Sequence, residues 1–180
     1  MQFIPKTFDH KRVIIAAALL TALAGAAIAQ QNKETVKVPE GLALSEFAGY
    51  EKWQMVSVSH NGDLLDVVLG NPAMIEAFQA GIPANGKKFP DGAKMVKIHW
   101  NTKKSPDGFP ATMPDTLHDL DLMAKDSKRF AATGGWGYGP LNYDAASENL
   151  VPMGKGTGCG FSCHTKAADR DYVFTEYPKR

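Results

Sequence analysis

Apolar and polar residues alternate in three stretches near the middle of the chain, a pattern typical of half-buried β-strands. The first stretch, residues 53–59, is followed at 61–63 by the turn sequence Asn-Gly-Asp. This turn predicts a hairpin in which residues 64–69 form the returning strand. Residues 94–100 form the third stretch. One of its faces carries Val96, Ile98 and Trp100, and the other carries Met95, Lys97 and His99.

Turn and helix signals divide the rest of the chain. Asn71 followed by Pro72 predicts the start of a short helix, and Gly81 is expected to follow its end. Residues 105–114 hold three prolines and a glycine and are expected to be irregular. Further strands are expected at 117–125, 134–143 and 171–177. The predicted fold class is therefore mainly β (α+β), an antiparallel sheet with one or two short helices.

The first 29 residues have the organisation of a secretory signal peptide. Three basic residues precede an apolar run at 13–26, and the small-x-small sequence Ala-Ile-Ala at 27–29 offers a cleavage site. The run is shorter than the roughly 20 apolar residues of a membrane span, which disfavours the alternative of an uncleaved anchor. We therefore expect residues 1–29 to be removed and the mature protein to start at Gln30 in the periplasm.

Charge and length limit what the mature chain can be. Residues 1–29 contain three basic residues and one acidic residue, so their removal lowers the formal net charge from +1 to about −1. Such a protein has no electrostatic footprint for nucleic acid or for an anionic membrane. About 150 residues remain, enough for one domain. We expect an arm and lead-in at 30–52, loose over 30–39, and a single domain at 53–180.

The chemistry of the chain concentrates in Cys159-Gly-Phe-Ser-Cys163-His164, which contains both of its cysteines. In c-type haem proteins two thiols add to the haem vinyl groups, and the histidine that follows binds the iron. The usual spacer has two residues and this one has three, an excess that the conformational freedom of Gly160 is expected to absorb. The main alternative is a disulfide in an oxidising compartment. A zinc site lacks a second ligand pair, and a redox pair would have the shorter spacer.

Three segments, in order along the chain, resemble the cytochrome P-460 family, whose relatives include cytochrome c prime beta. They are Phe-Pro-Asp-Gly-Ala-Lys-Met-Val-Lys at 89–97, Lys-Asp-Ser-Lys-Arg-Phe at 125–130, and Cys-His at 163–164 followed by Tyr-Val-Phe-Thr-Glu-Tyr at 172–177. The resemblance implies an exported, mainly antiparallel β protein that is often a homodimer. It also implies one haem c (iron) per chain, held by Cys159 and Cys163 and ligated by His164.

In the cytochromes P-460 a lysine side chain is joined covalently to the edge of the haem ring, and the resemblance places that lysine at Lys97. A lysine in an otherwise apolar strand also needs a reason to be there. From the pattern alone, the alternative is that Lys97 and His99 lie together on a solvent-exposed face of the sheet. Lys94 is less suited to the cross-link, since it lies in the other register.

The sixth coordination position of the iron decides between ligand chemistry and pure electron transfer. The resemblance implies that this position is open or holds water. Met153, His99 or His118 would be the alternatives as a second protein ligand, although lone histidines more often make surface or hydrogen-bonding contacts. One family pattern also places a distal acid at Asp121, which would accept protons from a substrate. The plainer alternative is that Asp121 is one of several solvated acids on its strand.

Two classes of function follow from the resemblance. The first is an oxidoreductase that acts on hydroxylamine or related nitrogen oxides and passes electrons to a periplasmic partner. The second is a non-catalytic cytochrome that binds nitric oxide or transfers electrons, like cytochrome c prime beta. A haem cross-link through Lys97 would distinguish the two classes, because it changes the absorption spectrum and survives unfolding.

Overall fold

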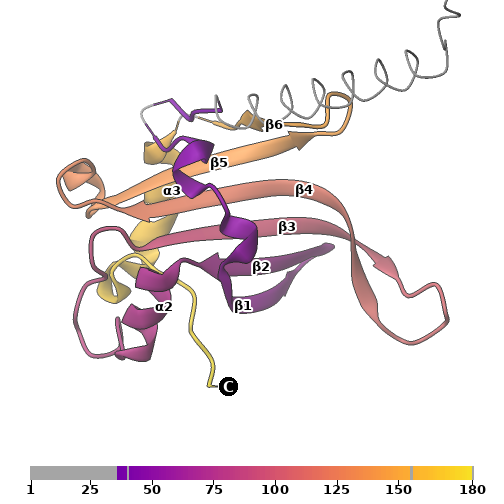
Figure 1. Cartoon of the computed structure of the whole chain (residues 1–180), viewed down its shortest axis with the longest axis horizontal. Coiled ribbons are helices and arrows are strands. Elements are labelled where there is room, and N and C mark those ends of the chain that lie inside the picture. Colours follow the sequence, from indigo (N-terminus) through magenta and orange to yellow (C-terminus); the bar gives the residue numbers. More distant parts are fainter. Residues whose placement is uncertain (1–35, 40, 155, 180) are drawn as a thin grey trace, which may run out of the picture.

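A computed structural model describes residues 36–39, 41–154 and 156–179. Its centre is a six-stranded antiparallel sheet in which each strand pairs with the next one along the chain (Figure 1). This arrangement confirms the expected mainly β architecture. The strands are β1 (Gln54–Asn61), β2 (Leu64–Gly70), β3 (Lys94–Lys104), β4 (Thr112–Lys125), β5 (Trp136–Asp144) and β6 (Asn149–Pro152).

Short helices connect and cover the strands. The start of α2 (Pro72–Gln79) is fixed as expected, because the side chain of Asn71 accepts a hydrogen bond of 3.0 Å from Met74 N. None of the helices in the described part of the chain has the length and apolar character of a membrane span. The other helices are η1 (Leu44–Phe47), η2 (Tyr50–Lys52), η3 (Ala131–Thr133), α3 (Thr157–His164) and η4 (Thr165–Arg170).

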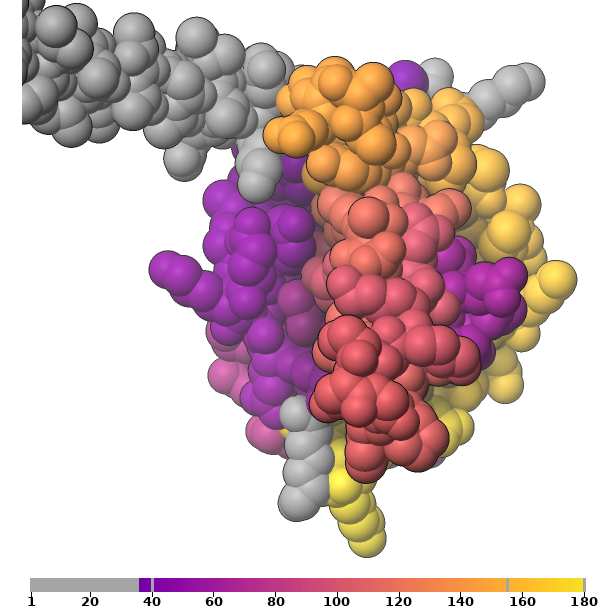
Figure 2. All heavy atoms as spheres, turned by 90° about the vertical axis from the view of Figure 1, so that its right-hand side faces the viewer, coloured from indigo at the N-terminus to yellow at the C-terminus, as the bar shows by residue number. Residues whose placement is uncertain are grey.

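Both faces of the sheet are covered, and each side has its own hydrophobic core. On one side Leu42 and Phe47 from the N-terminal segment pack with Val96 of β3. On the other side Met95 of β3 packs with Met74 of α2 and with residues of the C-terminal segment. Figure 2 shows the layers from the tip of the β3–β4 hairpin, with the indigo N-terminal segment on one side and the yellow C-terminal residues on the other.

Two expectations about the ends of the domain are wrong. Residues 171–177 form no strand, because Asp171 and Tyr172 adopt left-handed backbone conformations, with φ of 49° and 66°. The expectation of a loose arm is wrong for its described end, 36–39, where Val38 is fully buried against one face of the sheet and Lys37 pairs with Ala43. The expected signal peptide and residues 30–35 lie outside the described residues.

The irregular stretch expected at 105–114 is shorter than predicted. β3 extends to Lys104, and β4 begins at Thr112 and includes Pro114 opposite Thr102. A bulge interrupts the pairing on both sides of Trp100, which accommodates the change of register in this long hairpin. The haem motif lies on a helix, α3, which neither the apolar pattern nor the capping residues predicted.

Candidate functional site

Helix α3 presents both cysteines on one face. Cys159 and Cys163 are four residues apart, and residues at this spacing lie one above the other on a helix, with roughly 5–6 Å between their Cβ atoms. Both thiols are free and exposed. The three-residue spacer therefore fits a regular helix. The disulfide, which was the main alternative, is not formed in this structure.

The expectation that Gly160 absorbs the extra spacer residue through its conformational freedom is wrong. Gly160 lies inside α3 and has no positive φ, so it does not absorb an extra residue by an unusual conformation. A Cβ added at this position would lie only 2.5 Å from Cβ of Tyr138. Gly160 is therefore needed because α3 packs closely against β5, which brings the cysteines over the sheet.

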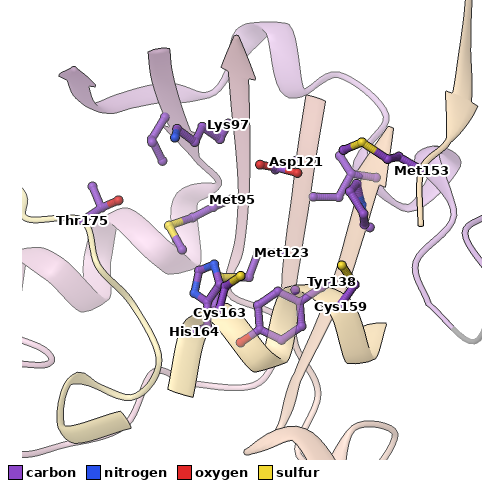
Figure 3. Close-up of a pocket in the computed structure, with 15 residues that line it drawn as sticks. Met95, Lys97, Asp121, Met123, Tyr138, Met153, Cys159, Cys163, His164 and Thr175 are labelled. Carbon is purple, nitrogen blue, oxygen red and sulfur yellow. The ribbon is translucent and has the colours of Figure 1, made fainter. Parts of the chain in front are cut away.

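A mostly apolar cavity of about 300 Å³ lies between α3 and the sheet (Figure 3). Cys159, Cys163 and His164 border it from the helix, and Thr175 borders it from the C-terminal segment. Residues of β2 to β5 form the opposite wall. The wall residues are Val68, Met95, Lys97, Asp121, Leu122, Met123, Tyr138, Gly139 and Pro140, and Met153 completes the lining.

His164 is held in the state that a metal ligand requires. Its Nδ1 lies 2.6 Å from the backbone oxygen of Tyr172, and because a carbonyl oxygen only accepts, Nδ1 carries the proton and Nε2 carries the lone pair. No described residue makes a hydrogen bond to Nε2. Burial lowers the pKa of His164 below its ordinary value, which favours the neutral imidazole. The ring also packs against Tyr138 and Phe174.

Lys97 and Asp121 lie on the cavity wall, next to each other across β3 and β4. Nζ of Lys97 lies 2.8 Å from Oδ2 of Asp66, a residue of β2 whose side chain is 1 % exposed. The Lys97 side chain is 33 % exposed and that of Asp121 is 50 % exposed. Two residues that the sequence analysis names as candidates, Lys97 and Asp121, thus line the same cavity as His164.

The alternative of a solvent-exposed face around Lys97 and His99 is wrong, because His99 is buried. Its Nε2 lies 3.2 Å from Asp121 and 3.3 Å from Asp119, and its Nδ1 lies 2.7 Å from Asp66. Burial alone would lower the pKa of His99, but the hydrogen bond to Asp121 and the charge of Asp119 outweigh it and raise the pKa. His99 thus belongs to a network of charges.

The two remaining candidate iron ligands, His118 and Met153, differ in whether they line the cavity. His118 does not line the cavity; it is exposed and lies 2.7 Å from Asp119. Met153 does line the cavity and is 36 % exposed.

Sequence reasoning missed three residues of the site. Met95 and Met123 bring thioether groups to the same cavity, and Asp66 is the buried partner of Lys97. The face of Met95 was readable from the alternation of β3. A carboxylate inside the otherwise apolar strand at 64–69 was the available signal for Asp66.

The residues present fit a covalently held haem. Two free thiols on one helix face, a histidine whose Nδ1 donates to a carbonyl oxygen, and a mostly apolar cavity that all three residues border supply the donor set and the enclosure of a c-type haem site. Fold and site together define a β-sheet haem protein of the c type.

Comparison with known proteins agrees with that definition. The family model described as cytochrome P460 matches residues 47–175, and the chain belongs to this family. It is therefore a haem-binding cytochrome of the c type. The match begins at Phe47, the last residue of η1, so it includes residues 47–52 of the segment expected to be an arm and lead-in. A search of curated proteins finds no match.

Proposed function

We propose that the protein is an exported periplasmic cytochrome with one haem c and an open distal position, and that it oxidises hydroxylamine. The observation that carries the proposal is the shared cavity, in which Lys97 and Asp121 lie on the sheet wall opposite the helix of His164. A periplasmic electron acceptor completes the reaction. A homodimer is part of the same proposal, by resemblance to the family.

Each residue of the cavity has a separate role in this proposal. Cys159 and Cys163 would hold the haem through two thioether bonds, and His164 would ligate the iron through Nε2. Bound haem would supply a redox-active iron. Asp121 borders the cavity and is half exposed, so its carboxylate would accept protons from a substrate and release them to water.

The open distal position is supported by the cavity lining. Among the described residues that line the cavity, His164 is the one histidine, and His99 is engaged by three carboxylates outside it. The other groups able to ligate iron are the thioethers of Met95, Met123 and Met153. Binding of carbon monoxide or nitric oxide to the reduced protein would support the open position, and its absence would indicate a methionine ligand.

A second function has one specific observation in its favour. Nζ of Lys97 forms an ion pair with buried Asp66, and an ammonium group in an ion pair is a poor nucleophile toward a haem ring. A protein in which this pair persists would carry an ordinary haem c and would bind nitric oxide or transfer electrons. Lys97 therefore separates the two candidate functions.

The test is the absorption spectrum and intact mass of the purified haem protein, with Lys97→Ala as the variant. A cross-link predicts a shifted spectrum and a haem bond to the peptide containing Lys97, both lost in the variant. Lys94→Ala is the matched control, because Lys94 is on the same strand but contacts Phe47 and Glu46 on the other face. An ordinary haem c spectrum that Lys97→Ala leaves unchanged would contradict the hydroxylamine function.

The same preparations test the reaction itself. Hydroxylamine oxidation should fall at least about ten-fold in Asp121→Asn, as expected when a general base is lost. Asp115→Asn is the control, since Asp115 is on the same strand and pairs with Lys103 away from the cavity. Export is tested by periplasmic fractionation and by sequencing the mature N-terminus, for which Gln30 is expected.

A further inference from the structure

The hydrogen bond from His164 to Tyr172 depends on an unusual turn. Tyr172 and the preceding Asp171 both have left-handed backbone conformations, which residues other than glycine rarely adopt. Two such residues in succession persist only where the surroundings hold them in place. The turn places the Tyr172 carbonyl oxygen 2.6 Å from Nδ1 of His164, so whatever holds the turn also holds the imidazole.

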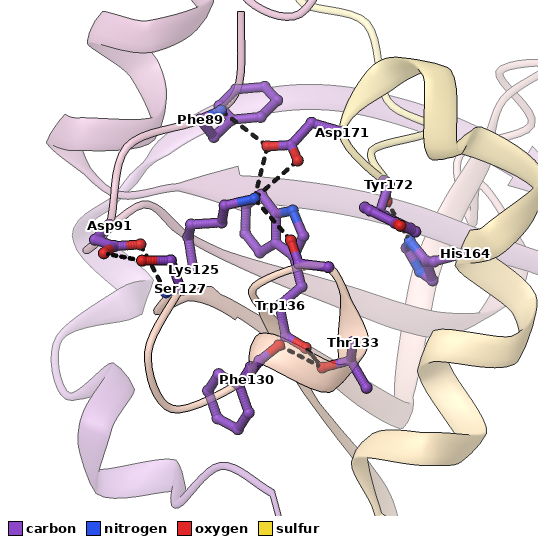
Figure 4. Close-up of polar contacts among 11 residues, drawn as sticks. Phe89, Asp91, Lys125, Ser127, Phe130, Thr133, Trp136, His164, Asp171 and Tyr172 are labelled. Carbon is purple, nitrogen blue, oxygen red and sulfur yellow. Dashed lines mark hydrogen bonds and ion pairs between the residues drawn. The ribbon is translucent and has the colours of Figure 1, made fainter.

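A buried ion pair holds this turn (Figure 4). Both carboxylate oxygens of Asp171 accept hydrogen bonds from Nζ of Lys125, at 2.8 and 2.9 Å. Phe89 N donates a third hydrogen bond, of 2.9 Å, to the same carboxylate. The side chains of Lys125 and Asp171 are only 4 % and 2 % exposed. Three hydrogen bonds from two distant parts of the chain therefore fix the carboxylate of the residue that precedes Tyr172.

The ammonium group of Lys125 also makes contacts beyond Asp171, with the loop formed by residues 126–135. Nζ donates a hydrogen bond of 3.1 Å to the carbonyl oxygen of Gly134 and lies over the ring of Trp136. The Tyr172 ring packs directly on Gly134, where an added Cβ would lie 2.2 Å from the ring. The ammonium group of Lys125 thus connects the Asp171–Tyr172 turn to the loop at 126–135, on which the Tyr172 ring packs.

That loop is itself held at both ends. Asp91 accepts two hydrogen bonds from Ser127, from the backbone N–H at 2.8 Å and from the hydroxyl at 2.7 Å. Thr133 donates from its hydroxyl to the backbone oxygen of Trp136 at 2.7 Å. The surface on which Tyr172 rests is therefore a fixed reference against which His164 is positioned.

Stability alone does not account for this pair. Replacing a buried ion pair by well-packed apolar residues is often neutral or stabilising, because desolvation offsets much of the attraction. What an apolar pair does not supply is a directed set of hydrogen bonds that determines where one carbonyl oxygen points. The hydrogen-bond partner of a metal-bound histidine sets the orientation of its ring and its strength as a donor.

We propose that Lys125 and Asp171 are positioning residues for His164, and that they act through the Tyr172 carbonyl on Nδ1 of its ring. This inference rests on the proposed role of His164 as iron ligand. The pair sets the direction of Nε2 and strengthens its donation to the iron, which lowers the reduction potential.

The experiment compares variants of the haem-loaded protein by resonance Raman spectroscopy of the reduced form and by potentiometry. Asp171→Asn keeps the shape of the side chain and removes its charge. Lys125→Met with Asp171→Leu removes the pair without leaving a buried charge unpaired, so that one informative variant folds. Lys125→Arg keeps the charge and should retain most of the effect. Lys103→Met with Asp115→Asn removes an exposed pair as the matched control.

The expected result is a lower iron–histidine stretching frequency and a higher reduction potential in both variants that remove the pair. Lys125→Arg should lie close to the unmodified protein, and the control should match it. Lower stability with unchanged frequency and potential would mean a purely structural pair and would overturn the inference. His164→Gly tests the proposed role of His164 as iron ligand separately from the positioning role of Lys125 and Asp171. If this variant keeps the iron–histidine band, His164 is not the ligand.

Discussion

Two lysine–aspartate pairs lie on either side of the haem cavity, and they are built differently. Behind His164, Lys125 and Asp171 are both fully buried, and every contact between them is a well-formed hydrogen bond. On the sheet wall, Lys97 is partly exposed, and its contact with Asp66 has the distance of an ion pair but not the angles of a hydrogen bond. The first pair is locked in one arrangement, whereas the second can change partners.

The difference indicates that the two sides of the cavity have different roles. A ligand that must stay on the iron benefits from a fixed support. A wall that faces a reacting molecule, or that gives up a lysine to a covalent bond, benefits from charges that can rearrange. Asp66 can exchange Lys97 for His99, because both lie within 2.8 Å of its oxygens. Matched substitutions on the two sides of the cavity should therefore have effects of different size.

The largest difference is expected in haem retention. Cys163→Ser removes one of the two attachment points and should lose most of the covalently bound haem, measured as the pyridine haemochrome of denatured protein. Met153→Leu, on the lining of the same cavity, should keep its haem and serves as the control. If a strain with working c-haem assembly yields a protein without haem and with a Cys159–Cys163 disulfide, the attachment site is wrong.

A smaller difference is expected in stability. Lys125→Met leaves Asp171 buried without its charge partner and should lower the free energy of unfolding by about 3–5 kcal/mol. Lys97→Met leaves Asp66 with His99 as a partner and should lower it by about 1–2 kcal/mol. Guanidinium unfolding of the two haem-loaded variants measures both values. Equal losses would show that the two pairs are held equally firmly.

The smallest effect concerns the pH dependence of the distal network. The pKa of His99 is raised in the folded protein by Asp121 and Asp119, so protonated His99 stabilises the fold. This contribution is complete below about pH 6.5, the ordinary pKa of histidine, and is lost as the pH rises through the raised value. The unfolding free energy of His99→Gln should therefore differ most from that of the unmodified protein near pH 5.5.

The same measurement at about pH 8.5 should show a smaller difference between His99→Gln and the unmodified protein. His60→Gln, on an exposed position of β1, is the control and should show little difference at either pH. A His99→Gln difference that grows toward high pH would mean that the three carboxylates do not favour the charged imidazole.

The sequence was sufficient to predict the middle of the sheet, and it carries the candidate haem motif as one continuous segment at 159–164. Alternation and turn residues carry the information for β1 to β4, because each of these strands pairs with a neighbour in the chain. The position of Lys97 and Asp121 on one wall follows from the same alternation. Such local patterns determine which face of a strand a side chain occupies.

The support of His164 was not predictable in the same way. Residues 171–177 look like a strand, because most of them are aromatic or β-branched, the residue types that are enriched in strands. The backbone instead turns at Asp171, since its carboxylate is bound by Lys125 and Phe89, 46 and 82 residues away. No local pattern reports a partner at that distance.

The order of the strands also has a consequence for how the protein forms. Because β1 to β6 pair in chain order, most neighbouring strands are joined by short connections, and β2 and β3 by the longer segment that contains α2, so each pair can assemble as soon as its own residues are available. The Lys125–Asp171 and Phe89–Asp171 contacts close much longer loops and involve one of the last segments of the chain. The sheet can therefore be complete before His164 has its support, and we expect haem attachment to find the sheet wall of the cavity in place before the histidine is fixed.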